Sequence, residues 1–296
     1  MKLPLAPLAP HLHPPRPASS LRAIGLAATA ALYDELALAP KPGLVSFVDT
    51  GSHRDMDADT FLRSLHALRP YFEEMAVRGW RLEPFQTLQA CGIAAEARML
   101  AATGGVNTHR GAIFSLGLLC AAAGAAVQAS PGRVLSPDWL RDRLMLHWAD
   151  ALEARSHQSS SLPGGIAARR HGLRSASMEA AAGFPALFET ALPALDAGLR
   201  KGIGAERARL DTLFHAMSVL DDTNLVHRGG MAGLQFARCA ARDFIADGGA
   251  GRPDGLAAAW ALHRRFVARN LSPGGAADTL AAACLLSRLR RLPGST

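Results

Sequence analysis

Long segments rich in alanine, leucine and arginine, separated by short runs of glycine and proline, most limit how this chain can fold. Hydrophobic residues make up 49% of the chain but aromatic residues only 6%, so the core must be built mainly from alanine, leucine and valine. No stretch of useful length alternates apolar and polar side chains as a half-buried strand does, and such a composition favours helices. The sequence therefore predicts an all-α fold, a single globular multi-helix domain with functional loops rich in glycine and proline.

Apolar residues recur at helical spacing along most of the chain. The expected helices cover residues 21–38, 58–78, 85–101, 109–127, 137–155, 176–198, 205–220, 232–246, 255–269 and 276–291. Pro70 should kink or break the second helix, and Gly183 and Pro185 should interrupt the sixth. The segment 156–172, which contains three consecutive serines and Pro-Gly-Gly, is expected to be a loop.

The first twenty residues contain six prolines, which leave no unbroken apolar core for a signal peptide. Residues 1–20 are expected to form a disordered leader, and 21–296 a helical catalytic domain. No 18-residue apolar span lacks charges, glycine and proline, which indicates no membrane segment. The four cysteines show no CxxC spacing, so we expect buried, reduced thiols in a cytoplasmic protein.

The formal net charge of +7 comes from arginines that are scattered rather than gathered in one run. Because no aromatic residues interleave with a basic run, a polyanionic small ligand is favoured over nucleic acid. The chain has neither GxxxxGK[ST] nor a GxGxxG that follows a strand, which excludes a P-loop and a Rossmann site. A nucleotide would therefore be bound by helix termini and metal-bound acids.

The strongest candidate for such a site is the stretch GGVNTHRGAIFSLGLL at 104–119. A side-chain oxygen of Asn107 or Thr108 can cap the helix that follows the glycine-rich turn. The free N–H groups of that helix and its dipole would then form a phosphate site, although an ordinary capped core helix also accounts for the string. The residues expected at this site are Gly104, Gly105, Asn107, Thr108, His109 and Arg110.

Two further polar clusters lie in the loop between the first two expected helices. Lys41 stands in a rigid Pro-Lys-Pro-Gly turn and is either a phosphate contact or a solvated loop lysine. His53, Asp55 and Asp57 follow closely, and the two acids can hold Mg²⁺ through oxygen ligands or act as a base. Asp57 or Asp59 can instead cap the next helix.

Other acids stand at helix ends or inside apolar helices. Glu35 and Glu96 occupy alanine-rich helices, where each must be paired or metal-bound if buried, or else faces solvent. Asp221, Asp222 and Asn224 offer oxygen ligands for Mg²⁺, or simply form an Asx-type turn. A second glycine-rich turn is another anion site or a helix cap with proline; its candidate residues are Ser272, Gly274 and Gly275.

Seven blocks in this order and spacing resemble the triphosphoribosyl-dephospho-CoA synthases over residues 21–292. The blocks are PKPGLV at 40–45, GSHRDM at 51–56, PYF at 70–72, NTHRGAIF at 107–114, GFP at 183–185, DTN at 222–224 and SPGGAAD at 272–278. The block that begins at Asn107 is the most specific.

This resemblance implies an all-helical, Mg²⁺-dependent enzyme that transfers the triphosphoribosyl unit of ATP to the 2′-hydroxyl of 3′-dephospho-CoA and releases adenine. The product is the prosthetic-group precursor for an acyl-carrier subunit of malonate decarboxylase or citrate lyase. Ser46 stands where many citrate-lyase members carry an acid, which favours the malonate branch. ATP and 3′-dephospho-CoA are thus the expected partners, with no nucleic acid and no membrane, and the oligomeric state, a homodimer included, stays open.

The chemistry of this transfer suggests roles for the candidates. A carboxylate would stabilise positive charge at the ribose anomeric carbon. The hydroxyl needs a base, for which the candidates are Asp55, Glu96 and Asp222. The departing adenine needs a donor, His53 or His109. Positive charge for the triphosphate would come from Lys41, Arg110 and Arg228.

Two other functions account for the same residues. A helical Mg²⁺-dependent N-glycosidic hydrolase of the ADP-ribosyl-hydrolase type would release free ribose triphosphate and need no acceptor. A non-enzymatic helical binding module would leave the acids and histidines unclustered in space.

Overall fold

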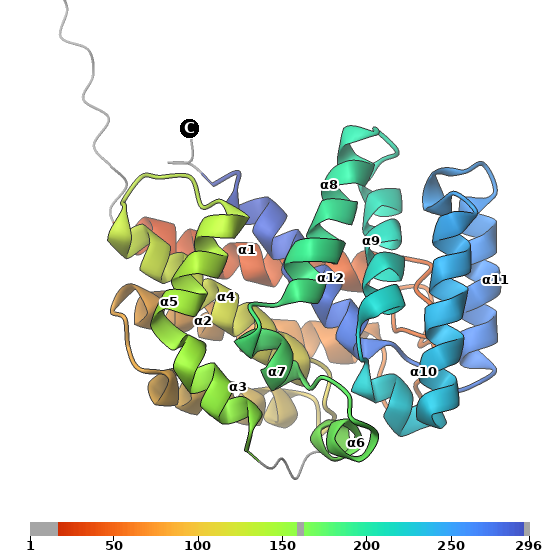
Figure 1. Cartoon of the computed structure of the whole chain (residues 1–296), viewed down its shortest axis with the longest axis horizontal. Helices are drawn as coiled ribbons and strands as arrows, with labels where there is room; N and C mark the ends of the chain where they lie inside the picture. The colour runs from red at the N-terminus through yellow and green to blue at the C-terminus, as the bar shows by residue number, and fades with distance from the viewer. Residues whose placement is uncertain (1–16, 159–162, 293–296) are drawn as a thin grey trace, which may run out of the picture.

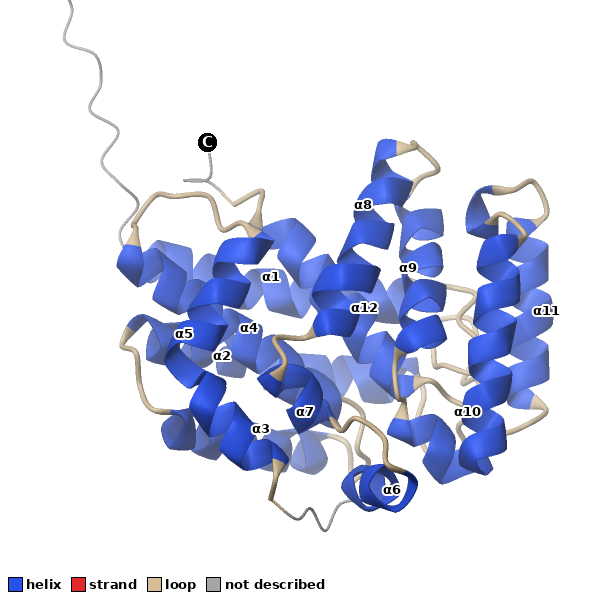
Figure 2. Ribbon diagram, in the orientation of Figure 1, coloured by secondary structure: helices blue, strands red, loops and turns tan. Residues whose placement is uncertain are grey.

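The computed structural model describes residues 17–158 and 163–292, and within them it contains helices and turns but no strand (Figure 2). The predicted all-α fold is therefore confirmed. The helices are α1 (Pro17–Ala37), α2 (Ala58–Trp80), α3 (Phe85–Ala102), α4 (Arg110–Ala129), α5 (Pro137–Ser156), α6 (Pro163–His171), α7 (Ala176–Ala181), α8 (Leu192–Arg200), α9 (Ala205–Val219), α10 (Thr223–Ala246), α11 (Gly255–Val267) and α12 (Gly274–Leu289). A π-helical turn at Ala186–Ala191 precedes α8, and a 3₁₀ turn at Gly249–Gly251 follows α10.

Helix α4 lies at the centre of the fold and packs against α1, α2, α3, α5 and α12 (Figure 1). Glycines allow the backbones of α2 and α4 to approach closely: a Cβ on Gly79 would overlap the backbone of Ala121, and one on Gly124 would overlap that of Ala76. By length and composition α4 could cross a membrane, but 78% of its most apolar window is buried inside the protein, as in a core helix.

Three boundaries differ from the sequence prediction. Helix α1 already includes Pro17, the first described residue, so the described helix extends four residues before the predicted start; the rest of the predicted leader lies outside the described residues. Helix α2 continues through Pro70 instead of breaking there. Helix α6 occupies part of the segment predicted as a loop and packs against α10, where Gly164 approaches the side chain of Thr223.

Helix α10 begins at Thr223, nine residues before the predicted start at 232. Gly230 has non-helical backbone angles (φ 62°, ψ −167°), so α10 consists of two helical pieces that meet at a kink. The first piece falls between the predicted helices 205–220 and 232–246. It carries two of the candidate site residues, Asn224 and Arg228.

The four cysteines are free, as expected, but Cys239 is exposed whereas the other three are buried. Cys239 lies on the solvent side of α10, although its alanine-rich helical surroundings had suggested a core position.

Candidate active site

A buried ion pair joins the end of α1 to the loop that follows it. The Lys41 ammonium donates to Glu35 Oε1 at 2.5 Å and to the Glu35 carbonyl at 2.7 Å, and both side chains are almost fully buried. Burial lowers the pKa of Lys41, and the Glu35 carboxylate opposes that shift. The interpretation of Lys41 as a solvated loop lysine was wrong, because the side chain is buried against Glu35, a partner that no sequence motif reveals. Its contact with phosphate stays a prediction.

His109 lies beside this pair at the first turn of α4. Only 3% of its surface is exposed, and Nδ1 lies 2.6 Å from the hydroxyl of Ser64 on α2, whereas Nε2 is buried without a hydrogen-bond partner among the described residues. Burial, and secondarily the charge of Lys41, lowers the pKa of His109 to about 3. The imidazole is therefore neutral at physiological pH and can bind a ligand but cannot act as an acid in its charged form.

Asp278 of α12 faces the same start of α4. Its carboxylate accepts the N–H of Ala112, and a Cβ on Gly111 would overlap it, so glycine at that position lets the carboxylate reach the positive end of the helix. Burial raises the pKa of Asp278 well above its ordinary value, and the nearby negative charges of Glu35 and Asp222 raise it further. We call the group Glu35, Lys41, His109, Asp222 and Asp278 the interior cluster.

Asp222, the N-cap of α10, is the remaining member of the interior cluster. Its two oxygens accept the N–H groups of Asn224 at 3.0 Å and Ala276 at 3.1 Å, and burial raises its pKa. Gly274 and Gly275 leave room here, because a Cβ at either position would press against the side chain of Asn224 or Asp222. The Asx-type turn is therefore present, and it joins α10 to α12.

The five predicted Mg²⁺ ligands do not form a metal-binding cage. Asp57 caps α2 by accepting the N–H of Thr60 at 2.8 Å. Asp221 binds Arg238 at 2.6 Å and accepts the N–H of Arg174 at 2.8 Å. Asp55 is largely exposed. Within 17–158 and 163–292, no three histidine, cysteine or acidic side chains are grouped so as to hold a metal ion. Adjacency in sequence was misleading here, because neighbouring residues at a helix start point in different directions.

A second polar group lies next to the interior cluster, and we call it the Arg228 relay. Arg228 Nη2 lies 3.0 Å from His53 Nδ1, and His53 Nε2 lies 2.9 Å from the hydroxyl of Ser272. Arginine only donates, so Nδ1 must accept and Nε2–H must donate to Ser272, which leaves the serine proton to donate to a ligand. Burial first, and the charge of Arg228 second, lowers the pKa of His53 to about 4.

The Arg228 relay corrects the expected role of His53. This histidine is neutral and both of its nitrogens are engaged, so it holds Ser272 and does not protonate adenine. Arg228 also donates to the carbonyl of Ser52 at 3.1 Å and to Asn270 Oδ1 at 3.0 Å. These hydrogen-bond partners are neutral, and the acid that acts on the guanidinium charge, Asp55, is largely exposed.

The turn 103–109 corrects the predicted cap and shows one unpredicted pairing. Asn107 Oδ1 accepts the N–H of Arg110, the first residue of α4, at 3.1 Å, but the N-cap is His109, whose side chain caps no N–H of the helix. The hydroxyl oxygen of Thr108 is buried and without a partner within the described part of the chain. Arg110 is paired with Glu96 through contacts of 2.5 and 2.6 Å, so the positive charge and the carboxylate that were expected to act separately are bound to each other.

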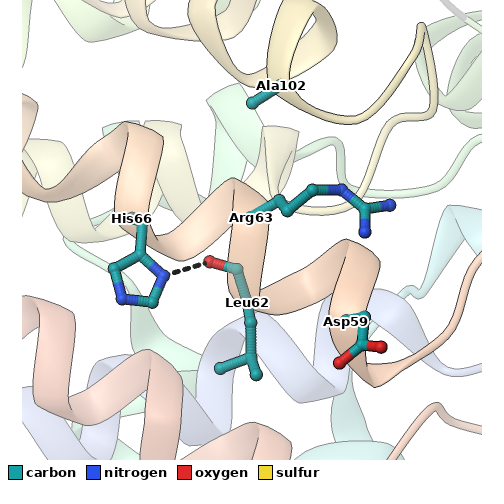
Figure 3. Close-up of a pocket in the computed structure, with 5 residues that line it drawn as sticks. All are labelled: Asp59, Leu62, Arg63, His66 and Ala102. Carbon is teal, nitrogen blue, oxygen red and sulfur yellow. Dashed lines mark hydrogen bonds between the residues drawn. The ribbon is translucent and has the colours of Figure 1, made fainter.

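Gly104 and Gly105 have positive φ values of 66° and 89°, with open space where a Cβ would lie. They are exposed, and they shape the turn that carries His109 to its buried position. A hollow of about 550 Å³ lies nearby on the outer side of α2 (Figure 3). Its lining residues are Asp59, Leu62, Arg63, His66 and Ala102. None of these residues belongs to the interior cluster. We therefore place the candidate site at the buried polar residues and not at this surface hollow.

Sequence reasoning missed two residues of this region, Ser64 and Asp278. Ser64 interrupts the apolar stripe of α2 between Phe61 and Leu65, and a polar residue on a core face was the available signal. Asp278 ends the block SPGGAAD, in which the serine and the glycines alone were predicted as site residues. One further histidine supports the loop: His263 Nδ1 lies 2.6 Å from the carbonyl of Lys41.

Comparison with known proteins gives one family. The model of the ATP:dephospho-CoA triphosphoribosyl transferase family matches residues 21–296. A probable 2-(5''-triphosphoribosyl)-3'-dephosphocoenzyme-A synthase of Vibrio cholerae serotype O1 (strain M66-2) is 38% identical over 279 residues, which cover 92% of this chain and 89% of that protein.

Two relatives carry the same name without the word "probable". The 2-(5''-triphosphoribosyl)-3'-dephosphocoenzyme-A synthase of Pectobacterium atrosepticum is 39% identical, with coverage of 86% of this chain and 85% of the relative. That of Klebsiella pneumoniae is 40% identical, with 87% of both chains covered. No solved structure matches the chain.

Proposed function

The chain belongs to the ATP:dephospho-CoA triphosphoribosyl transferase family, and we propose that its interior cluster carries out the transfer of the triphosphoribosyl unit of ATP to the 2′-hydroxyl of 3′-dephospho-CoA, with release of adenine. The observation that carries this proposal is the match over residues 21–296, which contain the whole interior cluster and the Arg228 relay. ATP and dephospho-CoA are the substrates, and the chain is a transferase.

The interior cluster suits the sugar end of ATP. Its three carboxylates outnumber its single ammonium, so the surroundings favour the positive charge that develops at the anomeric carbon when the bond to adenine breaks. Asp278 is our candidate for the base: a carboxylate with a raised pKa takes a proton more readily than an ordinary one. The 2′-oxygen then bonds to the anomeric carbon, adenine keeps the electron pair of its broken bond, and the hydroxyl proton finally resides on adenine.

The Arg228 relay suits the triphosphate. The Arg228 charge and the free proton of the Ser272 hydroxyl lie on the two sides of His53 and can both contact an anion. The interior cluster and the Arg228 relay thus lie on either side of the short turn 272–275. This arrangement matches a ligand with a ribose at one end and phosphates at the other.

Magnesium, in this proposal, arrives as part of the ATP substrate. Mg²⁺ commonly binds through one or two carboxylates together with substrate phosphates rather than in an all-protein cage. Asp278 and Asp222 supply carboxylates whose mutual repulsion a cation would relieve. Removal of Mg²⁺ with a chelator should therefore abolish turnover and leave thermal stability unchanged; a fall in stability would point to a resident ion.

Asp278→Asn tests the assignment of the site. We expect it to lower kcat by about two orders of magnitude or more, as removal of a general base does. Asp211→Asn is a matched control, because burial also raises the pKa of Asp211, which lies on α9 against the N–H of Ala250. Product is identified by its mass after incubation with ATP, Mg²⁺ and dephospho-CoA. Equal losses in both variants would remove Asp278 from the site.

We further propose that the product serves malonate decarboxylase. What supports this is Ser46, which replaces an acid expected in the citrate-lyase branch and whose hydroxyl accepts the N–H of Val48 at 3.2 Å in a turn. The free cysteines suit a reducing, cytoplasmic location. Deletion of the gene in its host should leave the acyl-carrier subunit of malonate decarboxylase without its prosthetic group; a fully loaded subunit would contradict the assignment.

A further inference from the structure

The contact between Ser64 and His109 links α2 to the first turn of α4 at the base of the interior cluster. Ser64 is completely buried, and its hydroxyl lies 2.6 Å from His109 Nδ1. Among the described residues, the Ser64 hydroxyl makes no other hydrogen bond and His109 Nε2 makes none at all. A buried polar atom without a partner in a native protein calls for a ligand or a specific reason.

The two possible tautomers of His109 leave different numbers of buried atoms unsatisfied. If Nδ1 carries the proton and donates to Ser64, both the serine proton and the Nε2 lone pair lack partners. If Ser64 donates to Nδ1, the imidazole proton is on Nε2, and that single N–H is left to find a partner. Each unsatisfied buried group is costly, so the second arrangement is favoured. The low pKa of His109 keeps the ring neutral in either case.

We propose that Ser64 is a positioning residue that fixes the proton of neutral His109 on Nε2, so that this N–H donates a hydrogen bond to a ring nitrogen of the departing purine. This inference rests on the proposed transfer reaction. As the bond between the anomeric carbon and the purine breaks, the electron pair passes to the purine ring, and a donor aimed at that ring stabilises the growing negative charge. His109 gives up no proton, because the proton that adenine acquires comes from the acceptor hydroxyl.

The tautomer can be measured in the free enzyme without any turnover. In protein labelled with ¹⁵N-histidine, the two ring nitrogens of a neutral imidazole give well-separated signals, and the His109 signals are those missing from His109→Gln. We expect protonated Nε2 in the wild type and in Ser64→Thr, which keeps the hydroxyl, and a shift toward protonated Nδ1 in Ser64→Ala. The same tautomer in Ser64→Ala, or protonated Nδ1 in the wild type, would overturn the inference.

Turnover provides the second measurement. Loss of one hydrogen bond should lower the kcat of Ser64→Ala by about tenfold, with KM nearly unchanged and Ser64→Thr close to wild type. His109→Gln should retain more activity than His109→Asn, because only the longer amide places an N–H near the position of Nε2. Equal activity of these two variants would refute the donor role. Failure of the wild-type enzyme to form any transfer product would instead refute the proposed function, while the tautomer result would stand.

Discussion

The buried pair of Lys41 and Glu35 gives the sharpest stability prediction. Lys41→Met removes the only ammonium within contact of a carboxylate whose side chain is 6% exposed, as far as the described residues show. Loss of one partner from a buried ion pair costs about 3–5 kcal/mol, because the other charge stays buried without compensation. The nearby carboxylate of Asp278 increases this cost, because it repels the Glu35 carboxylate. For a domain of this size the loss corresponds to a fall of roughly 10 °C in Tm.

The assay is urea unfolding of the wild type, Lys41→Met and the double variant Lys41→Met with Glu35→Gln. The double variant should recover most of the lost stability, because it leaves no unpaired charge. Glu189→Gln is the control: its partner Arg141 lies 2.8 Å away, but the Glu189 side chain is 60% exposed, so the change should cost less than about 1 kcal/mol. If Lys41→Met costs no more than this control, Lys41 is not held by a buried carboxylate and is free to contact phosphate.

Three further outcomes follow from the site. Asp222→Asn should lower the free energy of unfolding by about 1–3 kcal/mol in urea, because an amide group cannot accept both backbone N–H groups that the carboxylate accepts; unchanged stability would show that the cap is dispensable. Gly111→Ala should sharply reduce kcat by displacing the Asp278 carboxylate, whereas Gly92→Ala, which meets only ordinary contacts, should be active; equal activities would show that Asp278 can move without loss. Because the folded-state pKa of His53 is about 4 and its unfolded value about 6.5, the unfolded chain binds the extra proton between these values and stability rises with pH. Wild type should lose roughly 2–3 kcal/mol more than His53→Gln between about pH 7 and about pH 4.5, measured by urea unfolding, and identical pH dependences would contradict the low pKa.

The helices were predictable because each buries an apolar stripe whose period is set by the sequence. Two exceptions, α6 and the first piece of α10, involve glycine and proline at positions where the backbone remains helical or bends without ending the helix. Local rules treat such residues as breaks, and only the packing of α6 against α10 shows otherwise.

The sequence blocks that contribute to the candidate site could be predicted, but the ion pairs between their side chains could not. His109, Asp222 and Ser272, which the sequence offered as site residues, are all buried, and each stands at or near a helix start. That Lys41 is neutralised by Glu35, and Arg110 by Glu96, depends on which helix ends meet in space. The same holds for Asp278, whose neighbours come from three different segments of the chain.

The measurement that tests the central claim most directly is the amount of adenine released per molecule of product. Three mixtures contain the enzyme, ATP and Mg²⁺ with 3′-dephospho-CoA, with its 2′-deoxy analogue, or with no acceptor. The transfer reaction predicts one adenine for each triphosphoribosyl-dephospho-CoA in the first mixture and almost none in the other two. Equal release of adenine in all three mixtures would contradict transfer and identify hydrolysis of ATP at its glycosidic bond.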